Sequence, residues 1–147
     1  MSPRPPDPQA FAHLVSVLGP AAGKAHGFAS LAASFAKENH FGEAAIALAA
    51  AAASRPEVAA YHAGLGALYR RLGWLQWAVV AYETAIARGQ NDVCTWTSFG
   101  ETMLDLARYA EAAAALDKAI ALDPEGRDPS SVRARALALK GNRDLTR

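Results

Sequence analysis

Bulky and small residues recur along this chain at a fixed spacing of 34 positions. Three blocks, residues 25–58, 59–92 and 93–126, align with one another without a gap. In each block, bulky residues stand at positions 4, 7 and 11, which share one face of a helix, and again at positions 17 and 24. The pattern therefore predicts three tandem repeats, each made of two helices joined by a turn.

The residues at these positions keep their size class from block to block. The bulky residues are Phe28, His62 and Trp96; Leu31, Leu65 and Phe99; Phe35, Tyr69 and Met103; Phe41, Leu75 and Tyr109; and Leu48, Tyr82 and Leu116. The small residues, at positions 8, 20 and 27, are Ala32, Gly66 and Gly100; Ala44, Ala78 and Ala112; and Ala51, Ala85 and Ala119. Small side chains there let the two helices approach closely, because larger ones would hold them apart. A generic alanine-rich bundle has no reason to keep this register.

Residues that interrupt helices stand where the repeat needs a turn. Asn39 and Gly73, at position 15, suit the left-handed conformation that often ends a helix. Pro56 and Pro124 end the second helices of the first and third blocks. Alanine is abundant and β-branched residues are few, which also favours helix. The sequence therefore predicts an all-α protein.

This spacing of bulky, small and turn residues resembles the tetratricopeptide repeat (TPR). The resemblance implies a right-handed superhelix of three helix-turn-helix repeats over residues 25–126, with a short N-terminal helix and a C-terminal capping helix. Residues 1–8 contain four prolines and are expected to be disordered. Residues 9–24 are expected to form the short helix and a linker. Residues 127–147 are expected to form the capping helix and a tail, because the last repeat otherwise exposes its apolar face.

The charge balance and the single cysteine exclude several classes of function. The net charge is +1, with 15 basic and 14 acidic residues, so the basic field that nucleic-acid binding needs is missing. Cys94 stands alone, which excludes an internal disulfide and suits the reducing cytoplasm. The longest apolar run, residues 44–53, is too short to span a bilayer.

No arrangement of residues typical of catalysis, metal binding or cofactor binding can be assembled from the sequence. The four histidines are spread through the chain without metal-ligand spacing, and there is no phosphate-binding loop. The sequence therefore predicts a protein-binding module without a cofactor and without enzymatic activity.

The resemblance also implies where a partner binds. In TPR proteins, positions 2, 5, 6, 9, 12 and 13 of each repeat, on the first helix, face a concave groove. In this sequence, the candidate groove residues at these positions are Ala29, Ala33, Lys37, Ala60, Ala63, Ala67, Arg70, Cys94, Thr97, Ser98 and Glu101.

The composition of this predicted groove narrows the kind of partner. TPR adaptors that grip the C-terminal carboxylate of heat-shock proteins use Lys, Arg and Asn at such positions, whereas small residues stand at the corresponding sites here: Ala29, Ala33, Gly64, Cys94 and Ser98. A channel walled by small residues accepts an extended segment that carries bulky apolar side chains. The alternative is that alanine stands there only because the whole chain is rich in it.

Three polar candidates have two interpretations each. Glu101 either bonds a backbone amide of a bound peptide or is solvated. Arg70 either steers an acidic partner or forms a local salt bridge, and Cys94 is expected to be a small packing residue rather than a nucleophile.

One feature departs from the repeat pattern. Positions 16 and 19 are normally polar, but the second repeat has Trp74 and Trp77 there, with Val80 at position 22 and Ile46 as its counterpart in the first repeat. Exposed tryptophans indicate a covered surface. The sequence leaves open a homodimer or partner contact, packing of the N-terminal helix, or rings half-buried on their own turn. The apolar residues of that N-terminal helix are Phe11, Leu14, Val15 and Leu18.

Within the TPR proteins, the chain resembles the class II chaperones of type III secretion, which guard translocator proteins. The resemblance lies in the succession of helices, in the second repeat (Gly64-Leu65-Gly66-Ala67, then Gly73, Ala78 and Tyr82), and in Gly100-Glu101 followed by Met103-Leu104. It implies a cytoplasmic chaperone whose groove holds an extended apolar segment of a translocator, with homodimerisation plausible. The alternative is a general TPR adaptor or scaffold subunit of a bacterial envelope, pilus or regulatory complex.

Overall fold

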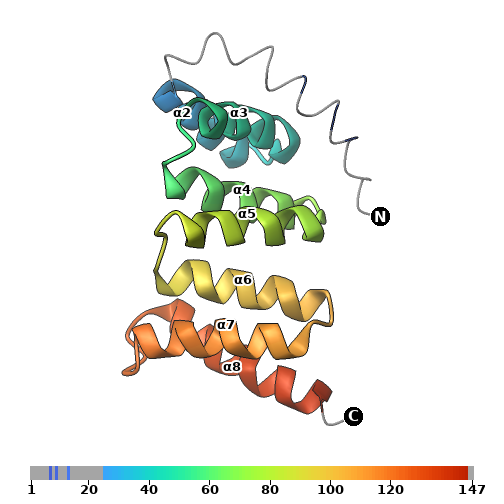
Figure 1. Cartoon of the computed structure of the whole chain (residues 1–147), viewed down its shortest axis with the longest axis vertical. Coiled ribbons are helices and arrows are strands. Elements are labelled where there is room, and N and C mark those ends of the chain that lie inside the picture. Colours follow the sequence, from blue (N-terminus) through green and yellow to red (C-terminus); the bar gives the residue numbers. More distant parts are fainter. Residues whose placement is uncertain (1–6, 8, 10–12, 14–24, 146–147) are drawn as a thin grey trace. The chain divides into compact units, whose positions relative to one another are not determined.

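The computed structural model describes residues 25–145 and, before them, Asp7, Gln9 and His13. Between residues 25 and 145 the chain forms seven α-helices and no strand (Figure 1), which confirms the all-α class. The helices are α2 (Ala25–Lys37), α3 (Phe41–Ser54), α4 (Ala59–Arg71), α5 (Leu75–Ala87), α6 (Val93–Asp105), α7 (Tyr109–Leu122) and α8 (Pro129–Leu145). None of these helices is long and apolar enough to cross a membrane.

The helices pair in chain order, α2 with α3, α4 with α5 and α6 with α7. The first helices of the three pairs begin at Ala25, Ala59 and Val93, where the predicted repeats begin. The chain divides after Gly89 into two compact units. The first unit contains α2 to α5, and the second contains α6 to α8. The expected disordered tail and N-terminal helix lie outside the described residues, apart from Asp7, Gln9 and His13.

The turn inside each repeat has the same geometry. The residue at position 15 is left-handed in all three repeats, with φ of 64° at Asn39, 79° at Gly73 and 58° at Ala107. In each case the next amide donates to the carbonyl five residues earlier, as from Trp74 to Tyr69 at 2.8 Å. Such a bond closes the end of a helix. The residue types of Asn39 and Gly73 predicted the left-handed conformation, but that of Ala107 did not.

Small residues at position 8 allow the two helices of a repeat to touch. A Cβ at Gly66 would lie 2.8 Å from the ring of Tyr82 on α5, and a Cβ at Gly100 would lie 2.7 Å from the Leu116 side chain on α7. Both distances are shorter than a carbon–carbon contact. Tyr82 and Leu116 are almost completely buried, so they have little room to move away.

α8 packs against α6 and α7 and closes the second unit. Ala134 of α8 is fully buried with Leu116 and Ala119 of α7, and Leu104 of α6 packs against this cluster. The loop before α8 is fixed by Asp123, whose carboxylate accepts hydrogen bonds from the Ser131 hydroxyl and the Asp128 amide at 2.6 and 2.7 Å. These bonds hold the pKa of the Asp123 carboxyl below its usual range. α8 therefore covers the last repeat as a cap.

Candidate functional site

The candidate groove residues of the first unit lie on α2 and α4, and five of the seven are alanines. Solvent reaches all of them: Ala33, Lys37, Ala60 and Ala67 are exposed, and Ala29, Ala63 and Arg70 are half-buried. Five of these seven side chains are thus methyl groups, and the other two, Lys37 and Arg70, are positively charged.

Gly64, beside these residues on α4, has a packing role. A Cβ at Gly64 would lie 2.7 Å from Cδ2 of Leu48 on α3. The absence of a side chain there lets α3 and α4 of successive repeats come together, since any larger residue would displace Leu48. This one small residue is therefore explained without a bound partner.

In the second unit, α8 contacts two of the four candidate groove residues of α6. Thr97 is 1% exposed and donates its hydroxyl to the backbone carbonyl of Ser130 at 3.1 Å. The Glu101 carboxylate accepts a hydrogen bond from the Arg133 guanidinium of α8, and its side chain is only 14% exposed. The structure therefore places Thr97 and Glu101 under the chain's own capping helix. The sequence predicted either a peptide amide or bulk solvent as the partner of Glu101, and it predicted no contact with Arg133.

The two remaining candidates on α6 are accessible. Cys94 is exposed, so it is not the small packing residue that the sequence predicted, and Ser98 is half-buried. In the described part of the chain, no group of three or more His, Cys, Asp or Glu side chains is arranged to hold a metal ion.

The tryptophans of the second repeat form a ring cluster with Tyr69 of α4. Trp74 stacks on Tyr69 with ring centroids 6.0 Å apart, and Trp77 meets the same ring edge-on at 5.4 Å and 86°. The two indoles contact each other at 5.7 Å. Burial raises the pKa of the Tyr69 hydroxyl to about 12. Of the three alternatives, rings half-buried on their own turn correspond to these contacts, while Val80 beside them is 62% exposed.

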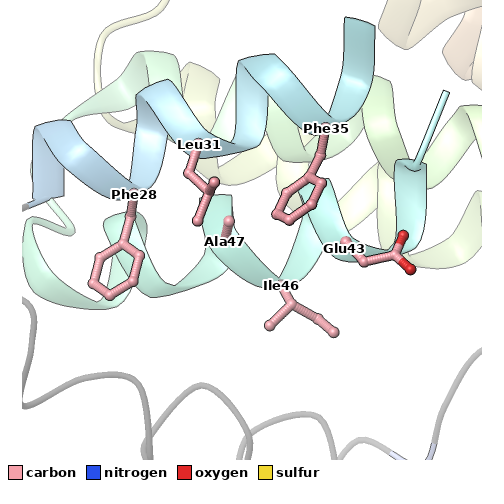
Figure 2. A pocket seen from close by; sticks show the side chains of 6 residues that line it. All are labelled: Phe28, Leu31, Phe35, Glu43, Ile46 and Ala47. Atoms are coloured by element: carbon pink, nitrogen blue, oxygen red, sulfur yellow. The ribbon is translucent and has the colours of Figure 1, made fainter. Parts of the chain in front are cut away.

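The first repeat has a hollow where the second repeat has these rings. It has a volume of about 260 Å³ and is lined by Phe28, Leu31 and Phe35 of α2 and by Glu43, Ile46 and Ala47 of α3 (Figure 2). Its apolar walls distinguish it from a polar surface cleft. The sequence pattern matched Ile46 to Val80 by their position in the repeat but did not predict the hollow. At position 19, Glu43 of the first repeat lines the hollow, whereas the second repeat has Trp77 there.

The fold is similar to that of TPR domains. No protein-family model matches the sequence, and comparison with curated protein sequences finds no relative. Among solved structures, the Yersinia enterocolitica type III secretion chaperone SycD, in complex with a peptide of the translocator YopD, has a TM-score of 0.74 at 20% identity, covering 82% of this chain and 93% of that chain. PcrH in complex with the chaperone-binding region of PopD has a TM-score of 0.75 at 20% identity, covering 82% and 92%.

Other solved structures with this fold have different partners. The TPR2B domain of yeast Sti1, in a complex with Hsp70, has a TM-score of 0.75 at 22% identity, covering 84% of this chain and 99% of that chain. Likeness at this level of identity establishes the tetratricopeptide fold. It does not select among the partners that these proteins bind.

Proposed function

We propose that this protein is a cytoplasmic TPR chaperone that holds an extended apolar segment of a type III secretion translocator against the first helices of its first two repeats, α2 and α4. The observation that carries the proposal is the exposed alanine surface of α2 and α4, at Ala33, Ala60 and Ala67. A bound strand can bring its backbone close to such a surface and place larger side chains between the methyl groups. A similar fold occurs in SycD, in complex with a translocator peptide, and in PcrH, in complex with the chaperone-binding region of PopD.

The energetics of such binding favour moderate affinity. Each bulky apolar side chain that the client buries contributes about 1.5–3 kcal/mol. Ordering an extended segment and losing its free motion oppose this gain. A few buried side chains therefore correspond to micromolar binding, about −8 kcal/mol. Affinity in this range holds a client soluble and still releases it for export.

A second candidate is a general TPR adaptor or scaffold subunit of a bacterial envelope, pilus or regulatory complex. The cover that α8 places over Thr97 and Glu101 favours it, because this part of the surface is already occupied by the chain itself. A homodimer is compatible with either role.

Blocking substitutions on α4 test the binding surface. Ala63→Arg and Ala67→Arg place a long charged side chain on the alanine surface, and Gln76→Arg adds the same charge at an exposed position on α5. Tagged proteins are purified from the native cell, their partners are identified, and the affinity of a labelled peptide from the partner is measured by fluorescence anisotropy. The proposal expects the two α4 variants to weaken peptide binding at least about tenfold, with helicity retained and the Gln76 variant unaffected.

The identity of the partner separates the two candidates. A secreted, membrane-active protein with an extended apolar segment supports the chaperone, and a stable cytosolic complex supports the adaptor. If both α4 variants bind the partner's peptide as tightly as the unchanged protein does, the assignment of the surface is wrong.

A further inference from the structure

The first repeat leaves uncovered an apolar surface that the second repeat covers. Leu31 is 46% exposed, whereas Leu65, at the same position of the second repeat, is 6% exposed. α4 packs against α3, the second helix of the repeat before it. α2 is the first complete helix of the described chain, and beside Leu31 lies the hollow formed with Phe28 and Phe35 (Figure 2). Among the described residues, no second helix precedes α2, whereas α3 precedes α4 and packs against it.

The sequence before α2 has the register of such a helix. Counted back by one repeat length of 34 residues, Ala44 corresponds to Ala10 and Leu48 corresponds to Leu14. The chain thus keeps the small residue of position 20 and the bulky residue of position 24. On the adjoining face, where α3 buries three alanines, the earlier segment has larger apolar residues: Phe11, Val15 and Leu18 in place of Ala45, Ala49 and Ala52.

The described residues of this segment mark the beginning of a helix. The Asp7 carboxylate accepts a hydrogen bond from the Gln9 amide at 3.3 Å, as an N-cap side chain does. Gln9 and His13 are helical and exposed, one turn apart. The second helices of the repeats begin at positions that correspond to Asp7, and Gln9, two residues later, is helical.

The connection to α2 has a suitable length. Six residues, 19–24, join Leu18 to the start of α2, and four residues join α3 to α4. Six residues span at most about 20 Å, which is close to the length of a 13-residue helix such as α2. A short tether gives the segment a high local concentration at α2, against which a second copy of the chain must compete.

We propose that residues 8–18 form the second helix of an incomplete N-terminal repeat, and that this helix packs against α2 of the same chain and covers Leu31 and the edge of the hollow. Leu14 then lies against Ser30 as Leu48 lies against Gly64. The sequence pattern had offered the tryptophans of the second repeat as the surface for these residues. Trp74 and Trp77 already pack against Tyr69. Their apolar surface therefore gains less from a covering helix than the open hollow does.

Cysteine pairs test this placement in the full chain. In a Cys94→Ser background, Leu14→Cys with Ser30→Cys is expected to form an intramolecular disulfide under mild oxidation, because a disulfide needs Cα atoms within about 7 Å. Gln9→Cys with Ser30→Cys is the matched control, since Gln9 is exposed, and it should stay reduced. The bond is detected as faster migration of the monomer without reductant.

Three results overturn the proposal. One is a covalent dimer from the Leu14–Ser30 pair, which assigns the surface to a second copy. Another is a disulfide in the variant that combines Leu14→Cys with Val80→Cys and leaves Ser30 unchanged. Such a bond would place the helix beside the tryptophan cluster. The third is no disulfide from either pair at any time of oxidation.

A second measurement does not depend on disulfide geometry. Leu14→Asp is expected to lower the thermal midpoint by about 5 °C or more and to increase binding of an apolar fluorescent dye, because the hollow and Leu31 lose their cover. His13→Asp adds the same charge one residue away on the exposed face and should change neither. Equal effects of the two variants contradict the proposed packing.

Discussion

The Arg133 guanidinium of α8 donates a hydrogen bond to the Glu101 carboxylate of α6, and this ion pair joins the capping helix to the candidate binding surface. Beside it, the Thr97 hydroxyl donates to the Ser130 carbonyl of the same capping helix. Two of the side chains predicted to meet a partner are thus engaged by the chain itself. The candidate alanines that remain accessible to a partner are therefore those of α2 and α4.

A double-mutant cycle on this ion pair should reveal a modest coupling. Arg133 is 52% exposed and Glu101 is 14% exposed, so solvent screens the pair in part and the expected coupling is about 1 kcal/mol or less. Arg133→Ala alone should cost more than Arg133→Ala with Glu101→Ala, because the single change leaves a largely covered carboxylate without this donor. Urea unfolding measures each variant. Lys140→Ala, an exposed position on α8, is the control, and a loss there equal to that of Arg133→Ala would contradict a specific role for the pair.

Adding one methyl group at two glycines should have opposite effects. At Gly66 the new Cβ meets the buried Tyr82 ring at 2.8 Å, and Gly66→Ala is expected to destabilise the protein by about 1–3 kcal/mol. Gly42, near the start of α3, has no atom within 4 Å of a new Cβ, so Gly42→Ala should stabilise by roughly 0.5–1 kcal/mol through helix propensity. Thermal and urea unfolding of the two variants provide the comparison. Stabilisation by Gly66→Ala would show that α4 and α5 are not in close contact there.

The repeat could be predicted from sequence because the same packing problem recurs three times. Positions 8, 20 and 24 meet equivalent neighbours in each repeat, so a constraint such as that on Gly66 repeats in the alignment. The contacts of Glu101 and Arg133 could not be predicted in this way, since they join a repeat to a segment outside it. The hollow of the first repeat could not be predicted either, because the repeat pattern gives the size class of Phe28, Leu31 and Phe35 but not whether another element covers them.

Glycine at position 107 should stabilise the chain. It is left-handed, with φ of 58°, where an alanine side chain costs about 1 kcal/mol and glycine costs little. Ala107→Gly is therefore expected to raise the free energy of unfolding by about 0.5–1 kcal/mol. Gly73→Ala, at the same turn of the second repeat and with φ of 79°, should lower it by a similar amount. If glycine at position 107 destabilises, the turn does not have this conformation in solution.

Alkaline pH should weaken the first unit through Tyr69. Its pKa is raised to about 12 by burial against the usual value near 10, so the folded chain keeps a proton that the unfolded chain releases. The free energy of unfolding is unaffected by this group below pH 10. It then falls by up to about 1.4 kcal/mol per pH unit between 10 and 12. Tyr69→Phe should flatten this fall in urea unfolding measured across that range.

The matched control for this titration is Tyr61→Phe, which removes a hydroxyl from a half-buried tyrosine of the same helix. It should leave the steep loss of stability between pH 10 and 12 in place. Because Trp74 and Trp77 both contact the Tyr69 ring, their fluorescence should report the same transition, with the change in the unchanged protein centred nearer pH 12 than pH 10. A change centred at pH 10 would mean that the hydroxyl is solvated and that the ring cluster is open.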